Sequence, residues 1–306
     1  MKNETINVTM STDDNYCGHM CALINSILDN SKEKYNFYIF YSKEELSEKN
    51  RKIVKNLFDN KNCKIIFKEI GEDIFKKFNC SVDYINSTAY YRLVSFEKIL
   101  EKKVIYLDLD IIVNCDLKDL WNFSLGKSSI GAVYDYILGL KDGGDYFNSG
   151  VLVVNLEDWQ KNNSTKKCLD FLEKNKELLR YPDQDALNNV FRRKWKKLPL
   201  EFNRQKIIWD YPASIFKISK EKYNSLIKSK GIIHYTGPVK PWSFKYVFPD
   251  KKYYLKYLSK TPWREEVNKD ISIKNILFFL ARWLMYKLKN RDFVEGVIKS
   301  IKNAKK

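Results

Sequence analysis

The chain has 306 residues, and its composition excludes a disordered protein, because 44% of the residues are hydrophobic and 15% are aromatic. This length suffices for one large α/β domain, or for a domain with an appendage. Its 55 Lys and Arg residues exceed its 38 Asp and Glu residues, which gives a net charge of +17. The excess favours an anionic partner: nucleic acid, an anionic membrane surface or a phosphorylated small molecule.

The cysteines and the N-terminal segment indicate the compartment. Six cysteines are scattered without a CxxC pair, so neither a zinc ribbon nor a thioredoxin-type site is supported. The first residues, MKNETINVTMST, hold no apolar core of signal-peptide length. No apolar run reaches the roughly 18 to 20 residues that a membrane-spanning helix needs. We therefore expect a cytoplasmic protein in a reducing environment that does not span the bilayer.

Short apolar runs alternate with helical patterns through the first half of the chain. The alternation predicts a mostly parallel sheet with helices on both faces, in which ligands bind beyond the carboxyl ends of the strands. The expected strands are 6–10, 36–41, 64–67, 103–110, 130–135 and 150–156. The expected helices begin at about residue 21, at a capping pattern of Ser42 and Glu45 (ending near Phe58), at Asn86 or Ser87 (ending at Leu100), at about Asp158 and at Pro182.

The segment VIYLDLDIIVN places two carboxylates, Asp108 and Asp110, inside an apolar run with no cation in the adjacent sequence. Burying one unpaired carboxylate is costly, and burying two close together costs more. A spacing of two directs both side chains to the same side of an extended segment. A divalent cation, Mn²⁺ or Mg²⁺, would stabilise such a pair, because hard cations prefer oxygen ligands. The alternative is a strand end that enters solvent with two ordinary surface aspartates.

Three later segments combine polar residues with strand ends or helix starts. The second of them places Asp183 and Gln184 in the first turn of a helix that begins at Pro182. The third delivers His234, one of two histidines in the chain, from the end of an apolar strand, and Lys240 follows in a turn. Such a lysine is usually solvated, but beside a metal-bound diphosphate it would contact phosphate. The segments are DYFNSGVLVVNL (145–156), YPDQDALN (181–188) and IIHYTGPVKPW (232–242).

Six segments in order resemble glycosyltransferase family 8, which includes bacterial lipooligosaccharide galactosyltransferases and, more distantly, glycogenin. The resemblance covers roughly residues 5 to 245. It implies a GT-A fold, which is a single nucleotide-binding α/β domain, and retaining transfer of a hexose from a UDP-sugar with Mn²⁺. The segments are MSTDDNY (10–16), STAYYRL (87–93), YLDLDIIV (106–113), YFNSGVLVVNL (146–156), YPDQDALN (181–188) and HYTGPVKPW (234–242).

The same resemblance implies a role for each matching position. The metal would be bound by Asp108, Asp110 and His234, and Leu109 between the aspartates would lie against the donor. The stretch 137–147 is shorter than in many relatives, which leaves the identity of the acceptor open. The other implied roles are uridine or ribose contacts for Asp13 and Asn15, sugar or diphosphate contacts for Arg92, phosphate contacts for Gly237 and Lys240, hexose contacts for Asn148, Asp183 and Gln184, and acceptor contacts for Asp135.

The expected chemistry is catalysis of leaving-group departure. Breaking the anomeric C–O bond puts negative charge on the β-phosphate, which the metal and Lys240 would stabilise. Retention requires either attack on the same face or two successive inversions through a carboxylate nucleophile. The motif residue expected nearest the anomeric carbon, Gln184, is a neutral amide. We therefore favour same-face attack, with a β-phosphate oxygen accepting the proton of the acceptor.

The last part of the chain has a different character. From about Ile271 we expect two helices, and residues 274–306 contain nine basic and two acidic residues. Apolar stripes at helical spacing, aromatic residues and a lysine-rich face are typical of a helix that lies on anionic lipid. Two helices packed on the catalytic domain are the alternative. We divide the chain into a catalytic part, 1–250, and a basic C-terminal region, 251–306, that would hold the protein on the inner face of the cell membrane beside a saccharide or lipid-linked saccharide acceptor.

Two other functions fit parts of the sequence. A nucleic-acid-binding protein would account for the charge of +17, but no such motif is present and much of the excess lies in the tail, so we expect no nucleic acid partner. A glycogenin-like primer that glycosylates its own tyrosine is conceivable through Tyr286. The sequence leaves open whether the donor carries galactose or glucose.

Overall fold

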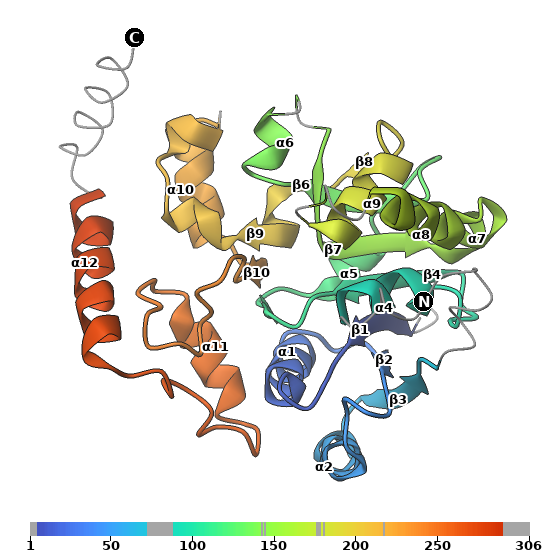
Figure 1. The fold of residues 1–306 in the computed structure, drawn as a ribbon, viewed down its shortest axis with the longest axis horizontal. Coiled ribbons are helices and arrows are strands. Elements are labelled where there is room, and N and C mark those ends of the chain that lie inside the picture. Colours follow the sequence, from blue (N-terminus) through green and yellow to red (C-terminus); the bar gives the residue numbers. More distant parts are fainter. Residues whose placement is uncertain are drawn as a thin grey trace.

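The computed structural model describes residues 5–71, 88–141, 143, 145–175, 179, 181–216 and 218–289. Figure 1 shows the strands stacked through the centre and the last helix at the opposite edge from α7 and α8. The strands are β1 Ile6–Ser11, β2 Tyr35–Tyr41, β3 Cys63–Glu69, β4 Lys103–Leu107, β5 Ile111–Val113, β6 Ile130–Tyr134, β7 Phe147–Asn155, β8 Lys196–Lys197, β9 Arg204–Gln205 and β10 Ile232–His234.

Helices connect most of these strands. The α-helices are α1 Cys17–Asp29, α2 Glu48–Phe58, α4 Thr88–Ser95, α5 Leu117–Trp121, α6 Leu138–Lys141, α7 Leu156–Lys161, α8 Ser164–Asn175, α9 Pro182–Val190, α10 Lys220–Lys228, α11 Lys251–Leu258 and α12 Ile273–Lys289. Three 3₁₀ helices lie between β8 and α10: η2 Leu200–Asn203, η3 Lys206–Trp209 and η4 Ala213–Phe216.

The main sheet has seven strands in the order β3-β2-β1-β4-β7-β6-β8. Strands β3, β2, β1 and β4 pair in parallel, and β8 runs parallel to β6. Strand β7 is antiparallel to both of its neighbours, β4 and β6. The fold is therefore the expected GT-A type α/β fold, with a mixed, mostly parallel sheet and a helical C-terminal region.

Side chains of the central strands alternate between two apolar cores. In β4, Ile105 and Leu107 belong to the core that also contains α1, whereas Val104 and Tyr106 belong to the core with α4, α7, α8 and α9. This alternation follows from the two-residue period of a strand. It confirms the expected helices on both faces of the sheet.

A second, three-stranded sheet has the order β5-β10-β9. Strand β10 is antiparallel to β5, with His234 opposite Ile111, and parallel to β9. Because β5 follows β4 after only three residues, this small sheet brings the end of β10 to the end of β4. Two segments more than 100 residues apart thereby meet at one edge of the main sheet.

Several expected boundaries were wrong. The capping pattern of Ser42 and Glu45 does not start α2, because these residues form a turn in which the Glu45 amide donates to the Ser42 carbonyl at 3.1 Å. The helix begins at Glu48 instead, since the Ser47 side chain accepts a hydrogen bond from the Asn50 amide. The preceding helix, α1, begins at Cys17 rather than near residue 21.

The other boundary errors affect the segments of the site. Helix α4 ends at Ser95 rather than at Leu100, which is exposed, and the expected caps Asn86 and Ser87 lie outside the described residues. Strand β4 ends at Leu107, so the two aspartates follow the strand instead of closing it. Strand β7 begins at Phe147, which places Asn148, Ser149 and Gly150 within the strand rather than before it.

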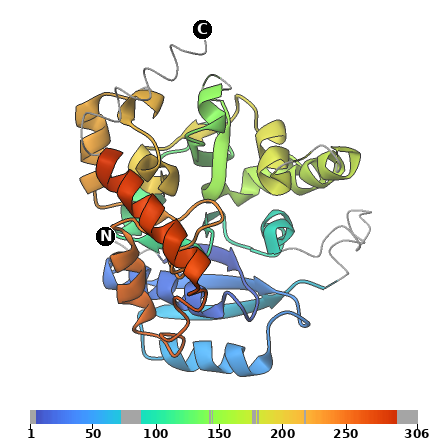
Figure 2. The ribbon, with the colours of Figure 1, turned by 60° about the vertical axis from the view of Figure 1, so that its left-hand side comes forward.

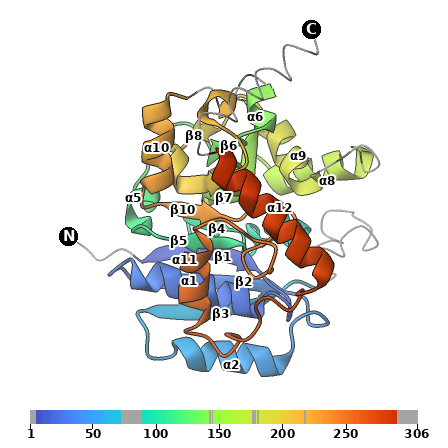
Figure 3. The same cartoon turned by 90° about the vertical axis from the view of Figure 1, so that its left-hand side faces the viewer.

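The C-terminal helices differ in how they pack. Helix α11 contacts α1, and Tyr254, Tyr257 and Leu258 are buried in the same core as the central strands. Helix α12 runs across the outside of the molecule (Figures 2 and 3). Within the described chain, no helix has both the length and the hydropathy that crossing a bilayer requires. The second expected tail helix falls in 290–306, outside the described residues.

One stripe of α12 faces the protein. Asn275, Phe279, Arg282 and Tyr286 are partly buried, at the spacing of one helical face. Arg282 forms an ion pair with Asp210, and the Tyr286 ring packs edge-on against Trp209 and Phe248. The rest of the helix surface is exposed and largely apolar, through Ile273, Ile276, Leu277, Phe278, Leu280, Trp283, Leu284, Met285 and Leu288.

Candidate active site

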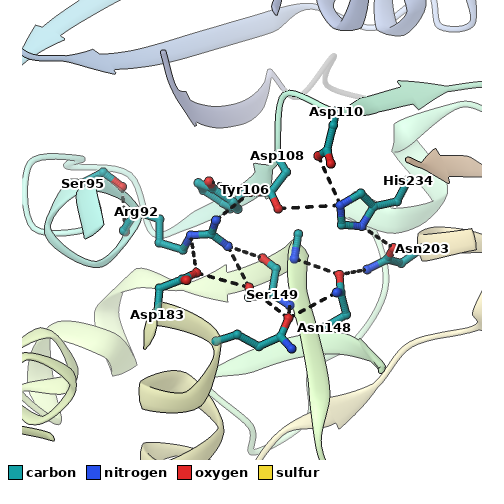
Figure 4. Close-up of polar contacts among 12 residues, drawn as sticks. Arg92, Ser95, Tyr106, Asp108, Asp110, Asn148, Ser149, Asp183, Asn203 and His234 are labelled. Carbon is teal, nitrogen blue, oxygen red and sulfur yellow. Dashed lines mark hydrogen bonds and ion pairs between the residues drawn. The ribbon is translucent and has the colours of Figure 1, made fainter. Parts of the chain in front are cut away.

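Asp108, Asp110 and His234 converge where β4 ends. The Asp108 amide donates to the Gly150 carbonyl at 2.9 Å, and the Tyr235 amide donates to the Asp110 carbonyl at 2.9 Å, so both aspartates are fixed by neighbouring strands. The His234 Nε2 atom lies 3.2 Å from Asp110 Oδ1 and 3.8 Å from Asp108 Oδ2. One ligand atom from each side chain lies within 4.8 Å of the others (Figure 4).

The orientation of His234 is set by a chain of side-chain amides. Its Nδ1 atom is 3.0 Å from Asn203 Oδ1, and the Asn203 amide nitrogen donates to Asn148 Oδ1 at 2.8 Å. Since the Asn203 oxygen accepts, His234 Nδ1 carries the proton in the neutral ring, and the Nε2 lone pair faces two carboxylates. Such an arrangement is unfavourable without a cation between the three groups. Two carboxylates and one imidazole form a donor set that Mn²⁺ or Mg²⁺ fits.

Gly150 makes room for this cluster. A Cβ atom at this position would collide with the His234 imidazole and lie 2.8 Å from Asp108 Oδ2. The absence of a side chain at this point of β7 therefore lets β10 approach the end of β4. This close packing explains the glycine at position 150. The hydrogen bonds from Asn148 through Asn203 to His234 explain the asparagine at position 148.

Arg92, on α4, neutralises the inner side of the cluster. Its guanidinium contacts Asp108 Oδ1 at 2.8 Å and Asp183 Oδ2 at 3.0 Å, and it donates to the Ser149 carbonyl at 3.0 Å. It also lies over the Tyr106 ring, and the Tyr106 hydroxyl donates to Asp108 Oδ1 at 2.9 Å. Burial opposes the charge of Arg92, but Asp108 and Asp183 outweigh it and raise the pKa of the guanidinium. For Asp183, burial raises the pKa of the carboxyl and Arg92 opposes the change.

Lys240 approaches the outer carboxylate. Its ammonium donates to Asp110 and to the Tyr235 carbonyl, the latter at 3.0 Å. Burial alone would raise the pKa of the Asp110 carboxyl. Lys240 and His234 together have the larger, opposite effect, so the pKa lies below its ordinary value. Gly237, between His234 and Lys240, has φ of +83°, a conformation that favours glycine in this turn.

A cavity of about 200 Å³ opens beside the carboxylates. Six of the residues predicted from the sequence line it: Asp13, Arg92, Asp108, Leu109, Asp110 and Lys240. Ser11, Thr12, Tyr16 and Tyr106 complete the lining. Asn15 does not line this cavity and is exposed, although it lies only two residues from Asp13.

Gln184 is buried in the first turn of α9. Its Oε1 atom accepts hydrogen bonds from the Ser149 amide at 3.0 Å and from Asn148 Nδ2 at 3.2 Å. Gln184 is thereby linked through Asn148 and Asn203 to His234.

Asp135 lies at the carboxyl end of β6, where it organises the following turn. Its Oδ1 atom accepts hydrogen bonds from the amides of Ile137 and Leu138, at 3.0 and 2.9 Å. The side chain is partly exposed, and neither of these turn contacts involves its other carboxylate oxygen, Oδ2.

Sequence reasoning missed the lining residues Ser11, Thr12 and Tyr16, and it missed Tyr106 and Asn203, which contact the cluster directly. Tyr106 precedes Asp108 by two positions, and this spacing on a strand was a usable signal that both side chains point to the same face. Asn203 carries no such signal, because it reaches His234 only through the pairing of β9 with β10.

Comparison with known proteins agrees with this arrangement. The family model described as glycosyl transferase family 8 matches residues 7–245. A putative glycosyltransferase of Haemophilus influenzae is 31% identical over 79% of this chain and 74% of its own length, and a lipopolysaccharide 1,2-glucosyltransferase of Escherichia coli is 27% identical over 97% and 90%. The crystal structure of galactosyltransferase LgtC with donor and acceptor sugar analogs is 26% identical, with a TM-score of 0.71 over 86% of this chain and all of that chain. The chain therefore belongs to glycosyltransferase family 8.

Proposed function

We propose that this glycosyltransferase is a retaining enzyme that uses Mn²⁺, or Mg²⁺, to move galactose or glucose from a UDP-sugar to a saccharide acceptor of the bacterial cell surface. The cluster of Asp108, Asp110 and His234 carries the proposal, because its partly buried carboxylates and the Nε2 lone pair need a cation. A bound metal would supply Lewis-acid stabilisation of the departing diphosphate. The similarity to a lipopolysaccharide 1,2-glucosyltransferase supports an acceptor in lipopolysaccharide or a related polysaccharide.

The lining of the cavity supports an assignment of the donor. Asp13, in the loop after β1, would contact the uridine or ribose, and Leu109 would pack against the nucleotide. Asn15, which lies in the same loop outside the lining, would reach the uridine or ribose from the cavity mouth. Lys240 would leave Asp110 and contact phosphate once the metal neutralises that carboxylate, since a buried lysine is stable only beside negative charge. The turn at Gly237 would present its main chain to the same phosphates.

The environments of Gln184 and Asp183 support same-face attack. A double inversion needs a free carboxylate at the anomeric carbon. Gln184 is a neutral amide, and the Asp183 carboxylate is held by Arg92 at 3.0 Å, which lowers its nucleophilicity. Asp183, Gln184 and Asn148 would instead position the hexose, with Arg92 beside it. The proton of the acceptor hydroxyl would then pass to a β-phosphate oxygen.

A larger cavity marks an approach for the acceptor. It measures about 580 Å³ and lies between η3, Phe248 and α12, with aromatic side chains from each of these segments. Lys206 lines it, and its Cε atom lies 3.8 Å from the position that a Cβ atom on Gly237 would occupy. We place the saccharide acceptor between this cavity and Asp135. Tyr286 also lines this cavity and packs edge-on against Trp209 and Phe248, so intact-mass measurement after incubation with the UDP-sugar separates a self-glycosylating primer from transfer to an external acceptor.

The outer face of α12 supports attachment to the membrane surface. Six exposed apolar side chains that do not line the 580 Å³ cavity share the helix with Lys274 and Lys287, namely Ile273, Ile276, Leu277, Leu280, Trp283 and Leu284. Arg282 fixes the opposite stripe to Asp210. Such a face binds at the headgroup boundary, and nearby cations add attraction to anionic lipid. We propose that the enzyme is cytoplasmic and peripheral on the inner face of the cell membrane, where lipid-linked acceptors lie.

The first prediction concerns the metal. EDTA should abolish sugar transfer and Mn²⁺ should restore it, because the leaving diphosphate loses its counter-charge without the cation. Asp110→Ala should lower kcat by about a thousandfold or more, in line with the loss of preorganised transition-state charge. Asp119→Ala, an exposed aspartate of the neighbouring α5, is the matched control and should retain activity. Full activity in excess chelator would refute the metal proposal.

The second prediction tests the amide chain behind His234. Asn203→Ala should weaken Mn²⁺ binding by about ten- to a hundredfold, because the partner of Nδ1 holds the imidazole in its ligating orientation. Titration of free Mn²⁺ by electron paramagnetic resonance measures this affinity directly, and far-UV circular dichroism checks the fold. Asn175→Ala, at the end of α8, is the control. An unchanged affinity in Asn203→Ala would mean that the amide chain does not orient the ligand.

The third prediction separates donor binding from chemistry. Asp13→Ala should mainly weaken UDP binding, whereas Gln184→Ala should mainly lower kcat with UDP affinity retained. UDP affinity by calorimetry and steady-state kinetics on both variants provide the comparison. The same kinetic profile in both variants would contradict their assignment to opposite ends of the donor.

The fourth prediction tests α12. Replacing Leu277, Leu280 and Leu284 by Gln should sharply reduce binding to anionic vesicles, because it removes the outer apolar face and leaves the Arg282–Asp210 contact in place. Metal-dependent hydrolysis of the UDP-sugar should persist, and transfer to a lipid-linked acceptor should fall. Leu100→Gln, at an exposed leucine outside α12, is the control. Unchanged vesicle binding would refute attachment through this face.

Truncation after about residue 270 complements this experiment. It removes both the outer face of α12 and its contacts with Asp210, Trp209 and Phe248. If the truncated protein unfolds or loses donor hydrolysis while the triple variant keeps it, α12 is an integral part of the packed fold. Binding of vesicles should weaken as salt rises for the intact chain, since salt screens the cations.

A further inference from the structure

A second polar cavity, of about 420 Å³, lies between the loop before β6, the turn between α7 and α8, and the end of α9. Among the described residues, its lining includes serine and asparagine side chains and no carboxylate. An aspartate does lie nearby, since Arg193 Nε is 3.8 Å from Asp145 Oδ2. The cations of the lining are Lys127, Lys167, Arg193 and Lys194.

The environment of Ser164 indicates that this cavity binds an anion. It lines the cavity as the first residue of the 12-residue helix α8, and only 1% of it is exposed. Its hydroxyl has no hydrogen-bond partner in the described part of the protein. The adjacent Thr165 hydroxyl, in contrast, accepts from Trp159 Nε1 at 2.8 Å and bonds the Leu93 carbonyl at 3.0 Å. A buried hydroxyl without a partner is unfavourable, and a ligand oxygen would satisfy it.

The N-terminal end of α8 adds backbone amide donors. The first amides of a helix have no acceptor within the helix, and the helix dipole makes this end positive. Together with the cations and the unpartnered hydroxyl, they form the arrangement that proteins use for phosphate oxygens. We propose that this cavity binds the phosphate group of a phosphorylated compound, at a site separate from the catalytic centre.

Two elements establish the separation. Asp183 and Gln184 lie in the first turn of α9, whereas Val190, its last residue, lines the cavity. Seven helical steps of 1.5 Å correspond to about 10 Å. Strand β6 likewise separates Ser129, which precedes the strand and lines the cavity, from the turn of Asp135, which follows the strand. The phosphate at this cavity is therefore not the diphosphate that Lys240 faces.

The position in the molecule favours a soluble source of the phosphate over a lipid headgroup. Helices α8 and α12 lie at opposite ends of the molecule in Figure 1. A membrane against the outer face of α12 would not extend to the start of α8. The cavity is also larger than a phosphate ion requires, which suits a phosphorylated compound of small size.

Inorganic phosphate is the probe for the test. We expect calorimetry to detect phosphate binding beyond that of chloride at the same ionic strength. The Lys167→Gln/Lys194→Gln variant should weaken the binding by about tenfold or more, since hydrogen bonds to charged groups are among the stronger ones. Ser164→Ala should weaken it as well. Lys174→Gln, on the last turn of α8 outside the cavity, should bind as the unchanged protein does.

To exclude phosphate binding at the catalytic centre, the series is repeated with Lys240→Gln added to every protein. Binding that persists in this background, and is lost with the cavity variants, supports the proposal. Equal binding by the unchanged protein and the Lys167→Gln/Lys194→Gln variant would overturn it, as would an equal loss in Lys174→Gln. Both cavity lysines are exposed, so this variant should fold even if Ser164→Ala does not.

A vesicle arm distinguishes the two sources of phosphate. Phosphatidylcholine vesicles with and without phosphatidic acid are mixed with the unchanged protein and the double lysine variant. Equal vesicle binding by both, beside lost binding of inorganic phosphate, assigns the site to a soluble compound. Weaker binding of the phosphatidic acid vesicles by the variant assigns it to a headgroup.

Discussion

The site depends on one electrostatic constraint: two partly buried aspartates and the lone pair of a buried histidine are held close together. Arg92 and Tyr106 compensate Asp108 from one side, and Lys240 compensates Asp110 from the other. Neither cation occupies the space between the carboxylates and His234 Nε2. That space is where a divalent cation would stabilise all three groups, and the rest of the proposed chemistry follows from placing a diphosphate on it.

The fold brings these three side chains together from separate elements. The short β5 and β10 bring His234 to the end of β4, and Gly150 in the antiparallel β7 leaves room for the imidazole. Helix α9 starts at the same edge, so that Asp183 reaches Arg92 and Gln184 joins the amide chain to Asn203. The proposed metal ligands and the residues proposed to position the hexose thus belong to one hydrogen-bonded unit.

Much of this could be predicted from the sequence, because apolar runs that end in polar residues mark the carboxyl edge of a sheet. Asp108, Asp110 and His234 were found in this way, together with the motif resemblance. The antiparallel direction of β7 could not be predicted, since the apolar pattern of a strand does not indicate whether it pairs in parallel or antiparallel. Asn203 and the Arg92–Asp183 pair depend on contacts across the fold, and the start of α2 was decided by Ser47 rather than by the equally plausible Ser42.

The most direct test is a crystal structure of the protein with Mn²⁺ and UDP, with anomalous scattering measured at the manganese edge. The account predicts one anomalous peak at coordination distance from Asp108, Asp110 and His234 Nε2, with the Lys240 ammonium moved from Asp110 to a phosphate oxygen. A structure in which UDP is bound, no peak lies among these three side chains and Lys240 still holds Asp110 would contradict it.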